Sequence, residues 1–113
     1  MYKIIIFGTG LYGKQALQFF TRENVMFWTD NKEDLHGKLI EGIEVIPPSE
    51  LKKYLNECVI VIAAKPEFFN QIKYQLNKEY GIEMALNYTF LKSYINDSGI
   101  SVGEFLSGCM EKD

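Results

Sequence analysis

The hydrophobic residues of this chain fall into short uninterrupted runs. Residues 4–7 and 59–64 are entirely apolar, and most of them are β-branched. Runs of this length and composition are typical of strands that are buried on both faces of a sheet. A third apolar run, 25–28, is followed after Thr29 by Asp30 and Asn31, which are residues that favour turns. We predict strands in five places: 2–7, 24–29, 43–46, 58–64 and 82–86.

Helical periodicity fills the gaps between these runs. Gly13, Ala16, Leu17 and Phe20 recur at the spacing of one helix face. Proline near the start of a segment is tolerated in a first helical turn, and it occurs at Pro48 and Pro66. We therefore predict a short helix after Pro48, a longer helix after Pro66, and tail helices over 88–95 and 102–110. The C-cap of the longer helix is predicted at Gly81. Its predicted inward residues are Phe68, Phe69, Ile72 and Leu76.

The alternation of strands and helices predicts the fold class. Chains of this pattern form a mostly parallel sheet with right-handed crossovers and helices on its faces. The polar segment 32–41 is interpreted as a loop. We predict an α/β fold, a small Rossmann-like three-layer domain, with residues 1–113 as a single domain, since this length suits one domain and leaves little room for a second.

A glycine-rich loop lies between the first predicted strand and the first predicted helix. It has the GxGxxG pattern, and its residues are Gly8, Thr9, Gly10, Leu11, Tyr12 and Gly13. In dinucleotide-binding folds the first glycine permits a tight turn, the second lets a phosphate approach the backbone, and the third allows close packing of helix and strand. The helix N-terminus then offers N–H groups and a partial positive charge to an anion. The loop therefore predicts a nucleotide site. A glycine turn that serves packing alone is the alternative.

Residues at the ends of two other strands complete the candidate site. Asp30 ends the second strand about twenty residues after the loop begins, where a carboxylate accepts hydrogen bonds from ribose hydroxyls. An aspartate there disfavours the 2′-phosphate of NADP by charge repulsion. We include Asn31 beside it, and Lys65, which follows the run 59–64 at a strand end and could meet a phosphate. A solvated lysine is the alternative for Lys65.

Three segments together resemble a known bacterial module. They are IIIFGTGLYGK at 4–14, FWTDN at 27–31 and HGKLIEGIEVIPPSEL at 36–51. The pattern is similar to the small Rossmann-like N-terminal domains of bacterial sugar O- and N-acyltransferases, which bind a UDP-sugar. It also resembles domains of membrane nucleotide-sugar dehydratases and of proteins with FkbM-type methyltransferases. The resemblance implies a nucleotide-binding module of sugar or polysaccharide metabolism, with a UDP-sugar or NAD as ligand. The hexapeptide repeats that carry acyl transfer are absent from this sequence.

Composition narrows the function classes further. The net charge of −3 argues against nucleic acid as a partner, and no apolar stretch is long enough to span a membrane. The run 4–7 is too short for a signal peptide, so we expect a cytoplasmic protein. Neither of the two cysteines, Cys58 and Cys109, lies in a CxxC pattern, so we expect both thiols to be reduced. His36 is the sole histidine, which excludes a multi-histidine metal site. We assign no catalytic and no metal-binding residue.

The expected function is thus nucleotide binding without turnover by this chain alone. An NAD-dependent oxidoreductase domain lacking its catalytic half and a ligand-free interaction domain are the alternatives. The tail segment 102–110 has an apolar stripe formed by Val102, Phe105, Leu106, Cys109 and Met110. The stripe predicts either packing on the chain's own sheet or an interface, in a homodimer or with a fused or separate catalytic domain.

Overall fold

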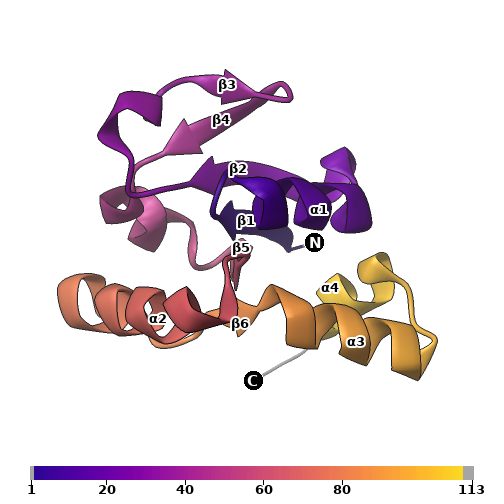
Figure 1. The fold of residues 1–113 in the computed structure, drawn as a ribbon. Coiled ribbons are helices and arrows are strands. Elements are labelled where there is room, and N and C mark those ends of the chain that lie inside the picture. The colour runs from indigo at the N-terminus through magenta and orange to yellow at the C-terminus, as the bar shows by residue number, and fades with distance from the viewer. Residues whose placement is uncertain (1, 111–113) are drawn as a thin grey trace.

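The chain folds around one six-stranded sheet (Figure 1). The structure is a computed structural model that describes residues 2–110. Its strands and α-helices are, in chain order, β1 (Lys3–Phe7), α1 (Leu11–Phe20), β2 (Val25–Thr29), β3 (Leu39–Ile40), β4 (Ile43–Ile46), β5 (Cys58–Ile62), α2 (Pro66–Tyr80), β6 (Leu86–Asn87), α3 (Tyr88–Ser98) and α4 (Val102–Met110). Short 3₁₀ segments lie at Arg22–Asn24, Glu33–Leu35 and Pro48–Tyr54.

The sheet has the strand order β3-β4-β2-β1-β5-β6. The neighbours from β4 to β6 pair in parallel, and only the added edge strand β3 runs antiparallel to its neighbour among the described strands. The predicted α/β class and mostly parallel sheet are confirmed. Setting β3 aside, the order matches the first five strands of a doubly wound nucleotide-binding sheet.

The core lies on both sides of β1, because alternate residues of a strand point to opposite faces. Ile4 and Ile6 pack in a cluster with residues of α1, α3 and α4. Ile5 and Phe7 pack in a second cluster with residues of the segment Pro48–Tyr54 and of α2. All four side chains are almost wholly buried, which is why the sequence has no polar residue in this run.

The predicted loop 32–41 is wrong in part, because it contains β3. Leu39 and Ile40 pair antiparallel with β4 and form a small hairpin whose turn holds Glu41 and Gly42, both at positive φ. Leu39 is exposed, so no alternation of buried and exposed residues marks the strand in the sequence.

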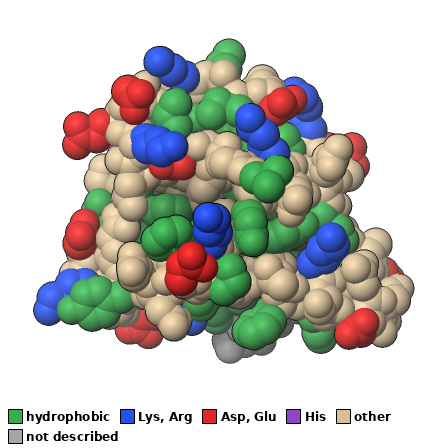
Figure 2. Space-filling view, viewed as in Figure 1, with side chains coloured by type: hydrophobic (Ala, Val, Ile, Leu, Met, Phe, Trp, Pro, Cys, Tyr) green, Lys and Arg blue, Asp and Glu red, His purple; other side chains and the backbone are tan. Residues whose placement is uncertain are grey.

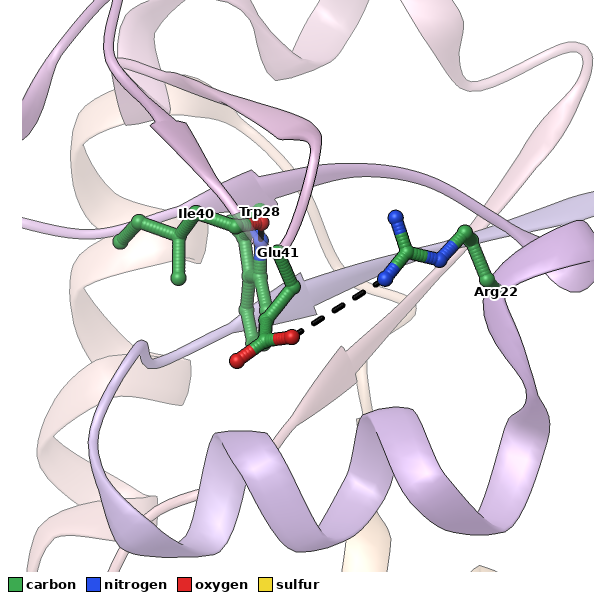
Figure 3. Close-up of polar contacts among 4 residues, drawn as sticks. All are labelled: Arg22, Trp28, Ile40 and Glu41. Carbon is green, nitrogen blue, oxygen red and sulfur yellow. Dashed lines mark hydrogen bonds and ion pairs between the residues drawn. The ribbon is translucent and has the colours of Figure 1, made fainter.

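Trp28 attaches this hairpin to the body of the domain. Its indole Nε1 donates a hydrogen bond of 2.9 Å to the carbonyl oxygen of Ile40, and its ring is fully buried. Figure 3 shows this contact together with the ion pair of Arg22 and Glu41, in which N and O are 3.9 Å apart. Both side chains of that pair are largely exposed, so the pair contributes little and the buried indole is the main anchor.

The predicted helix faces are correct with one exception. In α2, Leu76 is buried, and Phe69 and Ile72 pack against the core. Phe68, in the first turn of this helix, is 45% exposed, contrary to expectation. The predicted C-cap of this helix is confirmed, with Gly81 in the left-handed conformation.

The apolar stripe of α4 packs on the chain's own core. Leu106 is fully buried, and Val102, Phe105 and Cys109 pack against the same cluster. The side chain of Met110 lies outside the described residues. Among the helices of residues 2–110, none combines the length and apolar character that a membrane span requires.

Candidate functional site

The candidate site lies where the chain reverses direction across the sheet. After β1 the chain builds β2 and β4 on one side, and then crosses to place β5 on the other side of β1. The loops that leave the carboxyl ends of β1 and β5 therefore diverge and leave a crevice, which is where ligands bind in open parallel sheets. The glycine loop leaves β1 at this point, and Lys65 follows β5.

Two of the loop glycines are required by packing within the chain. Gly8 has φ of +119°, and a Cβ at this position would lie 2.5 Å from the carbonyl oxygen of Ala63. A Cβ on Gly13 would lie 1.9 Å from the carbonyl oxygen of Gly8 and 3.2 Å from the ring of Trp28. Any larger residue at either position forces the backbone apart. These two glycines would be needed even if nothing bound to the loop.

Gly10 is different, because nothing inside the chain requires a glycine there. Its φ of −84° is accessible to any residue, and a Cβ would have no heavy atom within 4 Å. Gly10 is the N-cap of α1, and no side chain of residues 2–110 caps this helix end through a hydrogen bond. The first turn of α1 therefore presents its N–H groups beside open space, which is the arrangement that binds a phosphate or carboxylate. Leu11 is 70% exposed, and Tyr12 is half-buried against the core.

Thr9 joins the glycine loop to the end of β2. Its backbone N–H and its hydroxyl both donate to Oδ2 of Asp30, at 3.0 and 2.9 Å. Oδ1 of the same carboxylate accepts a hydrogen bond from the backbone N–H of Lys32 at 3.0 Å. Asp30 thus lies directly beside the glycine loop, and it fixes the shape of two loops.

Asn31 faces away from the glycine loop. Its side-chain amide donates to Gln75 of α2 at 3.0 Å and accepts from the same residue at 2.7 Å. Both residues line a polar cavity of about 450 Å³, together with His36 and Tyr80. Burial and the neighbouring charge of Glu79 raise the pKa of Tyr80 above its ordinary value. None of the six loop residues lines this cavity.

Lys65 occupies the N-cap position of α2, and its side chain is exposed. It lies at the same edge of the sheet as the glycine loop, since both follow adjacent parallel strands. Within residues 2–110, no group of three or more His, Cys, Asp or Glu side chains could hold a metal ion.

Sequence reasoning missed several contacts of this region. Gln75 is too far from Asn31 along the chain for any motif to link them. His36 Nε2 lies 2.7 Å from the carbonyl oxygen of Asp30, so this ring nitrogen donates a hydrogen bond to the turn. The hydrogen bond from the backbone N–H of Lys32 to Asp30 could have been predicted from the sequence. In turns, an aspartate side chain often accepts a hydrogen bond from the backbone N–H two residues later.

Solved structures of a Rex-family repressor, RSP, have a similar fold. One is 17% identical with a TM-score of 0.55, covering 86% of this chain and 57% of the repressor chain. RSP in complex with β-NAD⁺ and operator DNA gives 18% identity, coverage of 86% and 55%, and a TM-score of 0.55. RSP in complex with β-NADH is 17% identical, with a TM-score of 0.54, and the match covers 87% of this chain and 61% of the repressor chain. The chain thus spans somewhat more than half of the repressor chain, and the likeness is one of fold.

The expectation that excluded nucleic acid is wrong, because a protein of this fold has been solved bound to operator DNA. That expectation used the net charge of the whole chain, whereas a nucleic acid contacts one surface. Figure 2 shows Lys and Arg side chains interspersed with Asp and Glu on one face.

The remaining comparisons concern family membership. A search of curated proteins finds no match. The family model and the repressor structures described above do not show the expected resemblance to sugar acyltransferase domains beyond a Rossmann-like fold. The family model described as C2185-like, N-terminal, matches residues 1–86, which is most of the chain. The chain therefore belongs to the C2185-like N-terminal family.

Proposed function

We propose that this chain binds a dinucleotide, NAD⁺ or NADH, at the glycine loop of a three-layer Rossmann-like domain formed by residues 1–113. The single observation that carries the proposal is the contrast among the loop glycines. Gly8 and Gly13 are explained by packing, whereas Gly10 leaves open space in front of an uncapped helix N-terminus. A ligand phosphate accounts for that space and for the missing cap.

The residues present fit the chemistry of a dinucleotide. The N–H groups of the first turn of α1 would bind the pyrophosphate. Asp30 Oδ1 accepts only one hydrogen bond in the described part of the chain, and a carboxylate oxygen has room for about two, so it can also accept a ribose hydroxyl. Lys65 would supply positive charge at the end of β5, and Asn31 would support Asp30 through its bonds to Gln75.

Asp30 also favours NAD over NADP. A 2′-phosphate placed at this carboxylate would bring two negative charges together at a partly buried site, which costs binding free energy. The solved repressors of the same fold carry β-NAD⁺ and β-NADH, which agrees with this choice. A UDP-sugar remains the second candidate, because its diphosphate would use the same helix N-terminus.

Chemical-shift mapping tests the proposal. The ¹⁵N-labelled chain is titrated in turn with NAD⁺, NADH, NADP⁺ and UDP-glucose, with adenosine as a ligand that lacks phosphate. We expect NAD⁺ or NADH to shift the amides of residues 8–13 and of Asp30, with NADP⁺ binding at least about tenfold more weakly. Shifts confined to other parts of the chain, or no shifts at millimolar ligand, would contradict it.

A further inference from the structure

A groove with a volume of about 850 Å³ lies beside the amino end of β5. It is bounded by β5, α3, α4 and the segment between α2 and β6. We call it the α3–α4 groove and define it by six of its lining residues: Glu83, Met84, Tyr94, Glu104, Phe105 and Gly108. The residues named for the nucleotide site lie at the carboxyl ends of the strands and do not line it. A role for this groove is therefore separate from nucleotide binding.

An occupant of the α3–α4 groove would contact side chains rather than the main chain of the sheet. The lining residues of β5, which are Cys58, Val59 and Ile60, are at most 9% exposed, so this strand is already covered. The accessible surface comes from the walls, where the side chain of Met84 is 61% exposed and that of Tyr94 is 57% exposed. The groove thus offers apolar and aromatic side chains to a partner.

The apolar surface continues beyond the groove along α3. Phe90 is 77% exposed and lies four residues before Tyr94, so the two rings are neighbours on one face of the helix. Phe90 does not line the groove. A small molecule held in the groove would leave Phe90 in water, whereas a helix lying along α3 would cover both rings. Exposed apolar surface of this extent usually marks a protein interface.

The charges that line the α3–α4 groove are negative. Among the described lining residues, the charged side chains are both carboxylates: Glu83 from the segment before β6 and Glu104 from α4. Oε1 of Glu104 accepts a hydrogen bond from the backbone N–H of Ser101 at 2.8 Å, which holds this side chain at the start of α4. The lysine of α3, Lys92, lies over the ring of Phe19 of α1. A fitting partner is therefore apolar on one face and positively charged beside it.

We propose that the α3–α4 groove binds an amphipathic helix of a partner protein, with its apolar face on Met84, Tyr94 and Phe105 and with Lys or Arg residues beside Glu83 and Glu104. A helix pairs its own backbone groups, so it needs no open strand edge, and its recognition depends on side chains. Because both carboxylates are exposed, they select the partner more than they strengthen binding. A second copy of this chain is disfavoured, because its net charge is −3.

A designed helical peptide tests the proposal. The probe is a capped peptide of about 18 residues, with leucine at every third or fourth position and lysine on both flanks. One control replaces each lysine by glutamate, and another scrambles the sequence so that no single apolar face remains. We expect the lysine peptide to shift the amide signals of Met84, Tyr94 and Phe105 in the ¹⁵N-labelled chain. Both controls should bind at least about tenfold more weakly.

Two exposed tyrosines provide a matched pair of variants. Tyr94 lines the groove, whereas Tyr74 of α2 is 66% exposed and does not line it. Both side chains lie largely in solvent, so Tyr94→Ala and Tyr74→Ala should both fold. We expect Tyr94→Ala to weaken binding of the lysine peptide at least about tenfold and Tyr74→Ala to leave it unchanged.

A charge reversal tests the selection of the partner. Glu83→Lys should weaken the lysine peptide and strengthen the glutamate peptide, each by at least about threefold. Glu44→Lys makes the same change at an exposed position of β4 outside the groove, and it should alter neither affinity. This control separates a local effect at the groove from the change in net charge.

Several results would overturn the proposal. Equal binding of the lysine and glutamate peptides would remove the charge argument, and equal effects of Tyr94→Ala and Tyr74→Ala would place the peptide elsewhere. No binding of the lysine peptide at millimolar concentration would exclude this kind of partner. A stable dimer of the free chain with Tyr94 in its interface would make a second copy the occupant. Titration with NADH reports on the glycine loop separately, so failure here is distinguishable from failure there.

Discussion

Asp30 Oδ2 accepts hydrogen bonds from both the backbone N–H and the hydroxyl of Thr9, at 3.0 and 2.9 Å. The two residues belong to loops that leave adjacent strands, β1 and β2. The pair therefore holds the glycine loop in one shape before any ligand arrives. A loop that is already ordered loses less conformational entropy on binding, which raises affinity.

The Thr9–Asp30 pair predicts a measurable coupling in stability. Asp30→Asn removes one acceptor oxygen and should cost about 1–3 kcal/mol, because Thr9 is buried and its donors lose their partner. Thr9→Val removes the hydroxyl alone and should cost about 0.5–1.5 kcal/mol. In urea unfolding the double variant should lose less than the sum, by at least about 0.5 kcal/mol. Strict additivity would show that the pair does not act as a unit.

Alanine substitutions at two of the loop glycines, Gly10 and Gly13, should differ strongly in their effect on the stability of the fold. Gly13→Ala places a methyl group 1.9 Å from the carbonyl oxygen of Gly8, and we expect at least about 3 kcal/mol of destabilisation or loss of folding. Gly10→Ala meets open space at an ordinary φ and should cost less than about 1 kcal/mol. Thermal and urea unfolding of both variants measure the difference. Equal losses of unfolding free energy in the two variants would contradict the difference in packing between Gly10 and Gly13.

The buried thiol of Cys58 predicts a pH dependence of stability. Burial, reinforced by Glu57, raises its pKa from 9.0 to about 11 in the folded chain. Between these values the unfolded thiol releases its proton while the folded thiol keeps it, so folding loses stability as pH rises. The loss should reach at most about 2 kcal/mol near pH 10.5. Cys58→Ser, which does not ionise there, should show a smaller loss between pH 8 and 10.5 in urea titrations, and an identical loss would contradict the assignment.

Much of the fold is encoded locally, which is why the sequence predicts it. The buried run in β1 and the helix face of Ala16, Leu17 and Phe20 in α1 each follow a single periodicity, and the structure contains both. The position of Asp30 beside the glycine loop follows from parallel pairing of β1 with β2.

The features that escaped prediction depend on contacts between distant segments. The hairpin of β3 and β4 relies on the hydrogen bond from Trp28 to Ile40 rather than on a hydrophobic pattern of its own. The pairing of Asn31 with Gln75 joins residues of different elements, and no local rule anticipates it. The short β6 begins only at Leu86, although the apolar residues before it suggest a longer strand.

Calorimetric titration with NADH of two variants, Gly10→Val and Gly108→Val, shows whether NADH binds at the glycine loop. Both variants put the same side chain where a Cβ meets no atom within 4 Å, but Gly108 lies at the opposite end of the sheet. We expect the native chain and Gly108→Val to bind NADH alike, whereas Gly10→Val should remain folded and lose at least about a hundredfold in affinity, because the valine occupies the phosphate position. Unchanged NADH affinity in a folded Gly10→Val variant, or no binding by the native chain at millimolar NADH, would contradict it.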